Sequence, residues 1–238
     1  MSTTETPIFH ARLTQKKQIA RDLLELHFDR PGGFDFLAGQ FVQFLVQDSD
    51  KELLRSYSLA STPTEKSLIF CVKILKDGKA SAMFSQMREG DSARFKGPRG
   101  RFIVDQSGPP HIFVATGAGL APIMGMIRDE LENKKTTAGI RLLFGVRSQE
   151  DIFWTDTLEH LQKTFPNFSY HLTLSQAEPN QEWSGHRGRV TEHTHGALTT
   201  SGKDSRWYLC GSTQMVKDMR GLLTNAGVDN AHIKFEIF

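Results

Sequence analysis

The sequence predicts two domains, an antiparallel β-barrel over residues 1–105 and an α/β domain with a parallel sheet over 106–238. Three observations lead to this prediction. Residues 8–105 contain short strand-like runs separated by turn residues, as in a small antiparallel barrel or sandwich. The run Gln-Ser-Gly-Pro-Pro at 106–110 can continue neither a strand nor a helix. From His111 onward strand-like and helix-like segments alternate, which indicates a parallel sheet with crossover helices.

In the first domain, alternation of apolar residues predicts the strands, and Pro and Gly predict the breaks between them. The expected strands cover 11–14, 23–28, 39–46, 55–60 and 67–75. A short helix is expected over 82–87, opened by the turn from Gly78 to Ser81, and its N-terminal N–H groups suit a pyrophosphate. The run from Gly97 to Phe102 is expected to close the barrel with a turn and a strand.

In the second domain, a buried-type strand over 112–115 runs directly into the glycine-rich turn Thr116-Gly117-Ala118-Gly119. Pro122 fits the first turn of the helix that follows. Glycines at a strand-to-helix turn let a diphosphate approach the backbone, although an isolated Gly-x-Gly is also compatible with a plain tight turn. The remaining expected elements are strands over 140–146, 168–174, 207–210 and 232–238, a helix over 154–165, a loop over 181–188, and a helix from the N-cap Ser212 to Gly227.

Ligands of open α/β sheets bind outside the carboxyl ends of the strands. We therefore expect Thr116, Arg147, Ser175 and Gln176, which follow three of these strands, to border one crevice. Cys210 ends a fourth strand beside the same crevice, and a small buried hydrophobic residue is its alternative role.

Composition excludes several classes of protein. The net charge of +2 disfavours a dedicated nucleic-acid binder, and two cysteines are too few for a disulfide framework or an iron–sulfur cluster. Neither a targeting signal nor a run of 18 apolar residues is present, so we expect a cytoplasmic enzyme without a membrane span. No metal site is expected, because no carboxylate or cysteine spacing accompanies His186, His193 and His195, and a solvated loop explains them better.

The segment from Arg55 to Ser61 concentrates an arginine, a tyrosine and hydroxyl groups in seven residues. An aromatic ring beside a guanidinium suits a large flat ligand that carries phosphate, and an edge strand with a solvated arginine is the alternative. Nearby, residues 73–101 carry eight cations against three anions. This excess either attracts an acidic partner or a phosphate group, or forms a lysine-rich sheet edge.

The motifs occur in an order that resembles the ferredoxin–NADP reductase superfamily. They are Arg-x-Tyr-Ser, Gly-Pro-x-Gly-x-Phe, Thr-Gly-x-Gly-x-Ala-Pro, Cys-Gly and a C-terminal Phe-Glu-x-Phe, and they span nearly the whole chain. The resemblance implies an FAD-binding barrel followed by an NAD(P)H-binding domain. It also implies that hydride passes from the nicotinamide to a tightly bound FAD. FMN remains an alternative to FAD at this point.

The resemblance also assigns roles to individual residues. It implies catalytic roles for Ser58, beside the reactive flavin nitrogen, and for Cys210 and Glu236. It implies flavin binding by Arg55 at the pyrophosphate, by Tyr57 on the flavin, by the backbone of Val72 and Lys73, and by the turn from Gly78 to Ser81. It implies nicotinamide nucleotide binding by Thr116, Gly117, Gly119 and Gly211, with Arg147 and Ser175 at the same crevice. Phe238 either covers the flavin ring or packs in the core.

One departure from the family bears on the coenzyme. Several NADPH-specific members have Ser-Arg where this chain has Ser175-Gln176, so the missing arginine favours NADH unless Arg147 or Arg187 replaces it. The expected function is an NAD(P)H-dependent flavoprotein reductase that serves a separate carrier, such as an acidic ferredoxin or an oxygenase component. A flavin reductase that releases free reduced flavin is the first alternative. A nucleotide-binding module without turnover is the second.

Overall fold

The computed structural model describes residues 7–105, 110–178 and 182–237. The chain divides into two units, one comprising Met1–Val104 with Met124–Asp129 and the other Asp105–Ile123 with Glu130–Phe238. The domain boundary expected at 105/106 stays a prediction, because residues 106–109 lie outside the described part.

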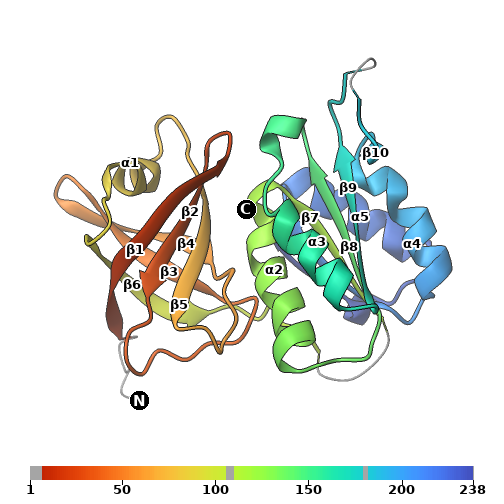
Figure 1. Cartoon of the computed structure of the whole chain (residues 1–238), viewed down its shortest axis with the longest axis horizontal. Coiled ribbons are helices and arrows are strands. Elements are labelled where there is room, and N and C mark those ends of the chain that lie inside the picture. The colour runs from red at the N-terminus through yellow and green to blue at the C-terminus, as the bar shows by residue number, and fades with distance from the viewer. Residues whose placement is uncertain (1–6, 106–109, 179–181, 238) are drawn as a thin grey trace. The chain divides into compact units, whose positions relative to one another are not determined.

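The first unit is an antiparallel barrel, which confirms the predicted class (Figure 1). Its strands follow one another in the order β4-β3-β6-β1-β2-β5. A bridge between Leu59 and Phe70 joins the first and last strands of this order and closes the sheet. The elements are β1 (Ile8–Ala20), β2 (Leu23–Asp29), β3 (Phe41–Asp48), β4 (Lys51–Ser58), β5 (Ser67–Lys73), α1 (Lys79–Gln86) and β6 (Ser92–Arg99).

Phenylalanine rings fill the interior of the barrel. The ring of Phe44 lies 5.1–5.6 Å from the rings of Phe28, Phe70, Phe84 and Phe95, centroid to centroid. Alternate residues of each strand supply these rings, because successive side chains of a strand point to opposite faces. The helix α1 contributes Phe84, so this short helix closes one end of the core.

Several element boundaries differ from the sequence-based expectation. The turn and strand expected from Gly97 to Phe102 are wrong, because Gly97 lies inside β6, which ends at Arg99. β4 begins at Lys51, four residues earlier than expected. β1 covers 13 residues instead of four, because it pairs with both β2 and β6 and its polar residues face outward. α1 begins at Lys79, three residues earlier than expected, and Gly78 is its N-cap. Alternation of apolar residues underestimates a strand whose outer face is polar over its full length.

The second unit is a parallel sheet in the order β10-β9-β8-β7-β11-β12, which confirms the predicted α/β class. The sequence winds outward in one direction from β7 to β10 and in the other from β11 to β12. The order therefore reverses between β7 and β11. The strands are β7 (His111–Thr116), β8 (Ile140–Val146), β9 (Phe168–Leu174), β10 (His186–Arg187), β11 (Arg206–Gly211) and β12 (Ile233–Ile237).

Helices cover both faces of this sheet. Figure 1 shows α2 and α3 on one side of the sheet and α4 and α5 on the other. The helices and single turns are η1 (Gly117–Gly119), α2 (Leu120–Arg128), η2 (Asp129–Asn133), η3 (Gln149–Asp151), α3 (Thr155–Thr164), η4 (Val190–His193), α4 (Thr194–Ser201), α5 (Thr213–Asn225) and η5 (Asn230–His232). In the described residues no helix is both long and apolar enough to cross a membrane.

The cap predicted for the last long helix is confirmed. The Ser212 hydroxyl accepts a hydrogen bond from the Met215 N–H at 3.3 Å, and Gly227, with φ of +85°, follows the helix. The loop expected over 181–188 is wrong in part, since β10 pairs there with β9. A strand of two residues has too few positions to show a period, so sequence alone misses it.

Candidate cofactor and nucleotide sites

The strand β4 positions the arginine and the tyrosine of the first motif on one face. Arg55 pairs with Phe44 and Tyr57 pairs with Val42 across β3, as alternation of side chains requires. The half-buried Tyr57 ring packs edge-on against the rings of Phe44 at 5.9 Å and Phe84 at 5.2 Å. Burial raises the pKa of Tyr57 against the opposing effect of Arg55, so the phenol stays neutral.

The Arg55 guanidinium remains available for a ligand. It is exposed and donates a hydrogen bond to the adjacent Leu54 carbonyl at 3.0 Å, and the described residues form no ion pair with it. Ser58, three residues further, is 4% exposed at the end of the same strand. The planar fork of an exposed guanidinium has the donor geometry that binds phosphate.

The strand β5 and the helix α1 supply the rest of the first site. Val72 is buried in the core and Lys73 is exposed, and both pair with β2. The first turn of α1 has no side-chain cap, because the N-cap is Gly78. The Ser81 hydroxyl is buried and accepts a hydrogen bond from the Leu75 N–H at 2.9 Å, so it fixes the turn before the helix.

A side chain at Gly78 would clash with the Ser81 hydroxyl, because a Cβ there would lie 2.6 Å from Ser81 Oγ. The uncapped N–H groups of α1 and the guanidinium on β4 are suitable partners for the two phosphates of a dinucleotide. The residues of the first unit therefore fit FAD.

In the second unit, the two glycines of the Gly-x-Gly turn differ in their surroundings. Gly117 has φ of +52° and nothing within 4 Å of a Cβ placed on it. A Cβ on Gly119 would lie 2.3 Å from the Cys210 carbonyl oxygen and 2.7 Å from Gly211 Cα. Gly119 is thus required by the backbone of β11, whereas the backbone at Gly117 is open.

Thr116 connects the end of β7 to the end of β11. Its hydroxyl accepts a hydrogen bond from the Ser212 N–H at 3.1 Å. The same oxygen lies 2.1 Å from where a Cβ on Gly211 would stand, and Gly211 has φ of +143°. The sequence predicted Cys210 beside the glycine-rich turn, and the resemblance added Gly211. The structure brings Thr116, Gly119, Cys210 and Gly211 together at the point where the strand order reverses.

Cys210 and Glu236 occupy paired positions on β11 and β12. Burial, with a smaller effect of Glu236, raises the pKa of the fully buried Cys210 thiol well above its usual value. The thiol is therefore neutral at physiological pH. Glu236 is half-buried. Phe238, expected near the flavin, lies outside the described residues.

The carboxyl ends of β8 and β9 meet at two backbone hydrogen bonds. The Ser175 N–H donates to the Val146 carbonyl at 3.0 Å, and the Gln176 N–H donates to the Arg147 carbonyl at 2.8 Å. Arg147, Ser175 and Gln176 are all exposed there. The Arg187 guanidinium instead donates to the Glu178 carbonyl at 2.8 Å.

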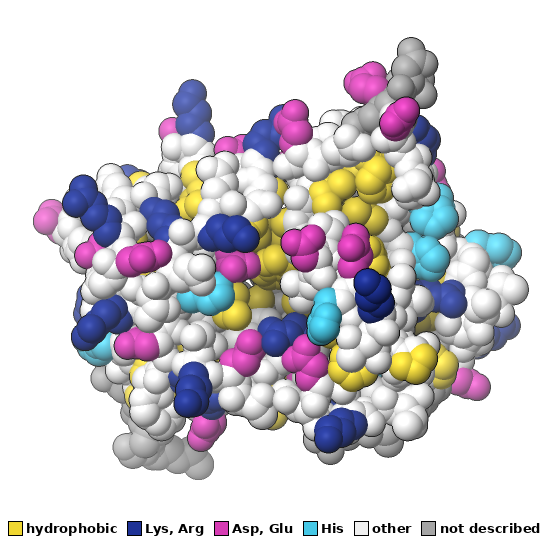
Figure 2. All heavy atoms as spheres, viewed as in Figure 1, with side chains coloured by type: hydrophobic (Ala, Val, Ile, Leu, Met, Phe, Trp, Pro, Cys, Tyr) yellow, Lys and Arg dark blue, Asp and Glu magenta, His cyan; other side chains and the backbone are white. Residues whose placement is uncertain are grey.

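Histidine side chains gather over the second unit (Figure 2). His186 Nε2 lies 3.3 Å from His171 Nδ1, and the rings of His186 and His193 are 4.4 Å apart. His171 was not expected in this group, because it lies 15 residues away on β9. His195 is exposed on α4. Within the described ranges no group of His, Cys, Asp and Glu side chains could hold a metal ion.

Each of the two units matches the model of a known protein family. Residues 10–103 match the oxidoreductase FAD-binding domain, and residues 113–221 match the oxidoreductase NAD-binding domain. The chain is 34% identical to ferredoxin–NADP reductase B of Sorangium cellulosum over 238 residues, which cover 96% of both chains.

More distant similarities extend to a larger protein and to a solved structure. The chain is 29% identical to one component of the Na(+)-translocating NADH-quinone reductase of Neisseria meningitidis, and spans about half (51%) of the length of that component. A ferredoxin NADP+ reductase from Neisseria gonorrhoeae, solved with bound FAD and NADP, has the same fold. Its TM-score is 0.85 at 22% identity, over 98% of this chain and 99% of that one. The chain therefore belongs to the ferredoxin–NADP reductase superfamily and is an NAD(P)H-dependent flavoprotein reductase that binds FAD.

Proposed function

We propose that the protein passes electrons from NAD(P)H through FAD to a separate, acidic carrier of the ferredoxin type. The observation that carries this proposal is the 34% identity to a ferredoxin–NADP reductase over 96% of both chains. The sequence has two cysteines, fewer than the four that an iron–sulfur cluster requires. These residues alone cannot build a one-electron carrier of that kind, which favours a separate protein in that role.

The residues of the first unit would bind FAD, and those of the second unit would bind the nicotinamide nucleotide. When bound, FAD accepts a hydride and gives up electrons one at a time. Arg55 and the first turn of α1 would hold its diphosphate, and Tyr57 would pack on the flavin ring. Hydride transfer depends on how each ring is positioned. We assign that task to Ser58 in the first unit, and to Cys210 and Glu236 at the ends of β11 and β12 in the second unit.

The nucleotide would bind at the second unit. We assign its diphosphate to Thr116 and the open backbone of Gly117, and its nicotinamide to the end of β11 at Gly211. Because Thr116 fixes Gly211 and Gly119 packs on Cys210, one rigid cluster sets both contacts.

The carrier would dock on the basic segment of residues 73–101, at the outer face of β6 (Ser92–Arg99). Arg94 and Lys96 alternate with the core residues Ala93 and Phe95, so both point outward. β6 lies between β3 and β1. Arg94 and Lys96 are therefore not part of a lysine-rich sheet edge, which was the alternative explanation. Arg94 forms an ion pair with Glu52, which leaves Lys96 as the stronger candidate for an acidic partner.

A survey of electron acceptors with the purified holoprotein tests this function. We expect reduction of an acidic ferredoxin, followed through cytochrome c, to slow with rising salt because the Debye length shortens. The Lys96→Glu variant should slow this reaction and leave ferricyanide reduction unchanged. The control is Lys217→Glu on α5, an exposed lysine of the second unit. Rapid turnover with free flavin and none with ferredoxin would instead identify a flavin reductase.

We also infer that NADH is the preferred coenzyme, because Gln176 replaces the arginine of the NADPH-specific pattern. Arg147 is exposed at the same edge and is the cation that would recognise a 2′-phosphate. The ratio of kcat/KM for NADH and NADPH tests this choice. If NADPH is preferred, Arg147→Ala should lower kcat/KM for NADPH alone, and Arg187→Ala is the matched control.

A further inference from the structure

Trp183 is a half-buried aromatic side chain near the sheet edge where the nucleotide's adenosine would lie, and this inference rests on the proposed nucleotide site. With the diphosphate at Gly117 after β7 and the nicotinamide toward β11, the adenosine must extend across β8 and β9. Neighbouring strands lie about 4.8 Å apart, so β9 is about 12 Å from the point where the strand order reverses. An extended dinucleotide covers that span, which places the adenine beside β9 and residues 182–185, directly before β10.

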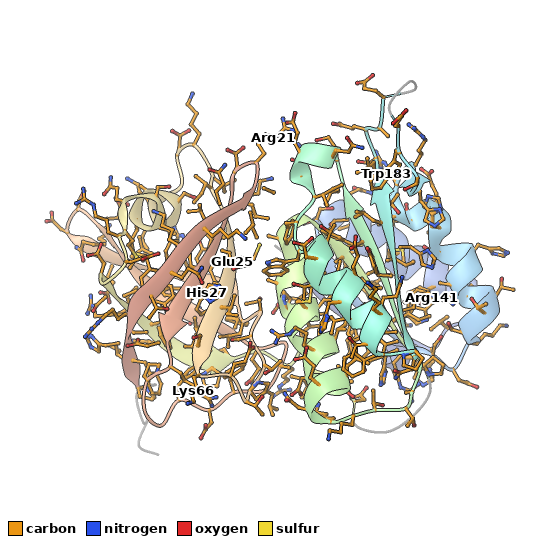
Figure 3. The ribbon with its side chains drawn as sticks, in the orientation of Figure 1. Arg21, Glu25, His27, Lys66, Arg141 and Trp183 are labelled. Carbon is orange, nitrogen blue, oxygen red and sulfur yellow. The ribbon has the colours of Figure 1, made fainter. Side chains whose placement is uncertain are left out.

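Trp183 lies in that segment and is held rigidly. Figure 3 shows it toward the upper end of β9, with Arg141, near the start of β8, placed lower. Its indole Nε1 donates to the His186 carbonyl at 2.9 Å. A Cβ on Gly185 would lie 2.4 Å from Trp183 Cζ2, so the indole lies directly against the glycine backbone.

A further hydrogen bond ties this segment to the end of the next strand. The Gln149 side chain, in the turn after β8, donates to the Glu182 carbonyl at 3.1 Å. The segment therefore spans the carboxyl ends of β8 and β9, where Arg147 and Ser175 are exposed.

The other two tryptophans have different surroundings. Trp207 is fully buried in the core behind the sheet, and Trp154 packs edge-on against Phe153 at 5.1 Å. Trp183 is half-buried, its N–H is satisfied, and a glycine covers it on one side. A rigid, partly exposed indole is a suitable platform for a purine base, which stacks through its π face.

We propose that Trp183 stacks on the adenine of NAD(P)H and is the residue that binds the adenosine end of the coenzyme. Gly185 is then a positioning residue, because it allows the indole to lie flat. The role of Trp183 is uniform binding, equal before and during hydride transfer, so its loss should raise KM and leave kcat unchanged.

Binding of ADP to the full-length holoprotein, measured by isothermal titration calorimetry, tests the proposal without turnover. ADP carries the adenosine and diphosphate and lacks the nicotinamide. Trp183→Leu should weaken ADP binding about tenfold, since stacking of one base on an aromatic side chain accounts for about 5- to 150-fold. Trp183→Phe should recover most of the affinity, and Trp154→Leu should stay within about twofold of the wild type.

The possible outcomes separate this inference from the proposed function. If the wild type binds ADP and Trp183→Leu binds it equally well, Trp183 is not the adenine platform. The same conclusion follows if Trp154→Leu, and not Trp183→Leu, loses affinity. If the wild type neither binds ADP nor oxidises NADH or NADPH, the nucleotide site itself is wrong. Retained FAD content and an unchanged far-UV spectrum confirm that the variants are folded.

Discussion

The contact between Gly119 and the carbonyl of Cys210 gives the sharpest prediction about the nucleotide-binding turn. In Gly119→Ala the new Cβ would lie 2.3 Å from that oxygen and 2.5 Å from the carbonyl carbon. Ordinary van der Waals contact begins near 3.4 Å, so the approach is about 1.1 Å too close. Both atoms belong to backbone, so no side-chain rotation relieves the overlap and the turn must move away from β11.

The expected destabilisation is about 3 kcal/mol, the upper end of the usual range for overpacking, because backbone must shift. Gly221→Ala in α5 is the matched control, since nothing lies within 4 Å of a Cβ there. It should stabilise the protein by about 0.5–1 kcal/mol through helix propensity. Gly117→Ala should destabilise by no more than about 1–2 kcal/mol, because it meets only an unfavourable φ.

Urea unfolding followed by tryptophan fluorescence measures these differences in the relevant unit. All three tryptophans, at positions 154, 183 and 207, belong to the second unit. A shift in the midpoint without a change in the m-value reports stability alone. If Gly119→Ala unfolds within about 0.5 kcal/mol of the wild type, the packing of the turn on β11 is not what requires glycine.

Three further predictions concern other contacts. Burial lowers the pKa of His171 and of His186 below 6.5, and repulsion from neighbouring histidines lowers both further, so the unfolded chain binds more protons in acid. Stability of the second unit should therefore fall as the pH drops below 6.5, and His186→Gln should flatten this dependence in urea unfolding at pH 5–8. Burial raises the pKa of Tyr208 to about 12, and its neutral hydroxyl accepts the Asp105 N–H at 3.1 Å. Tyr208→Phe should destabilise by about 1–2 kcal/mol at every pH from 6 to 9, and a loss that appears only above pH 8 would contradict a neutral acceptor. Arg55→Met should weaken FAD binding about tenfold or more in a fluorescence titration, because a charge-assisted hydrogen bond to phosphate is lost. Arg55→Lys should lie between Arg55→Met and the wild type, and equal affinity of all three would remove Arg55 from the site.

Local patterns in the sequence determined the fold class of both units. The apolar run of β7 followed by glycines predicted a parallel sheet with a nucleotide turn. The structure agrees, since every residue of this strand except the last is buried. The Ser212 cap was predictable for the same reason, because a cap depends on residues three positions apart. Such signals depend on neighbours along the chain, so they need no tertiary information.

Contacts between distant residues were decided only by the tertiary structure. The sequence presents Gly117 and Gly119 as equivalent members of one motif, yet only Gly119 packs on β11, which lies 91 residues later. The segment around Trp183 looked like a solvated loop, because its order comes from hydrogen bonds to β10 and to the turn after β8. A sequence records which residues can approach one another, and the fold decides which of them do so.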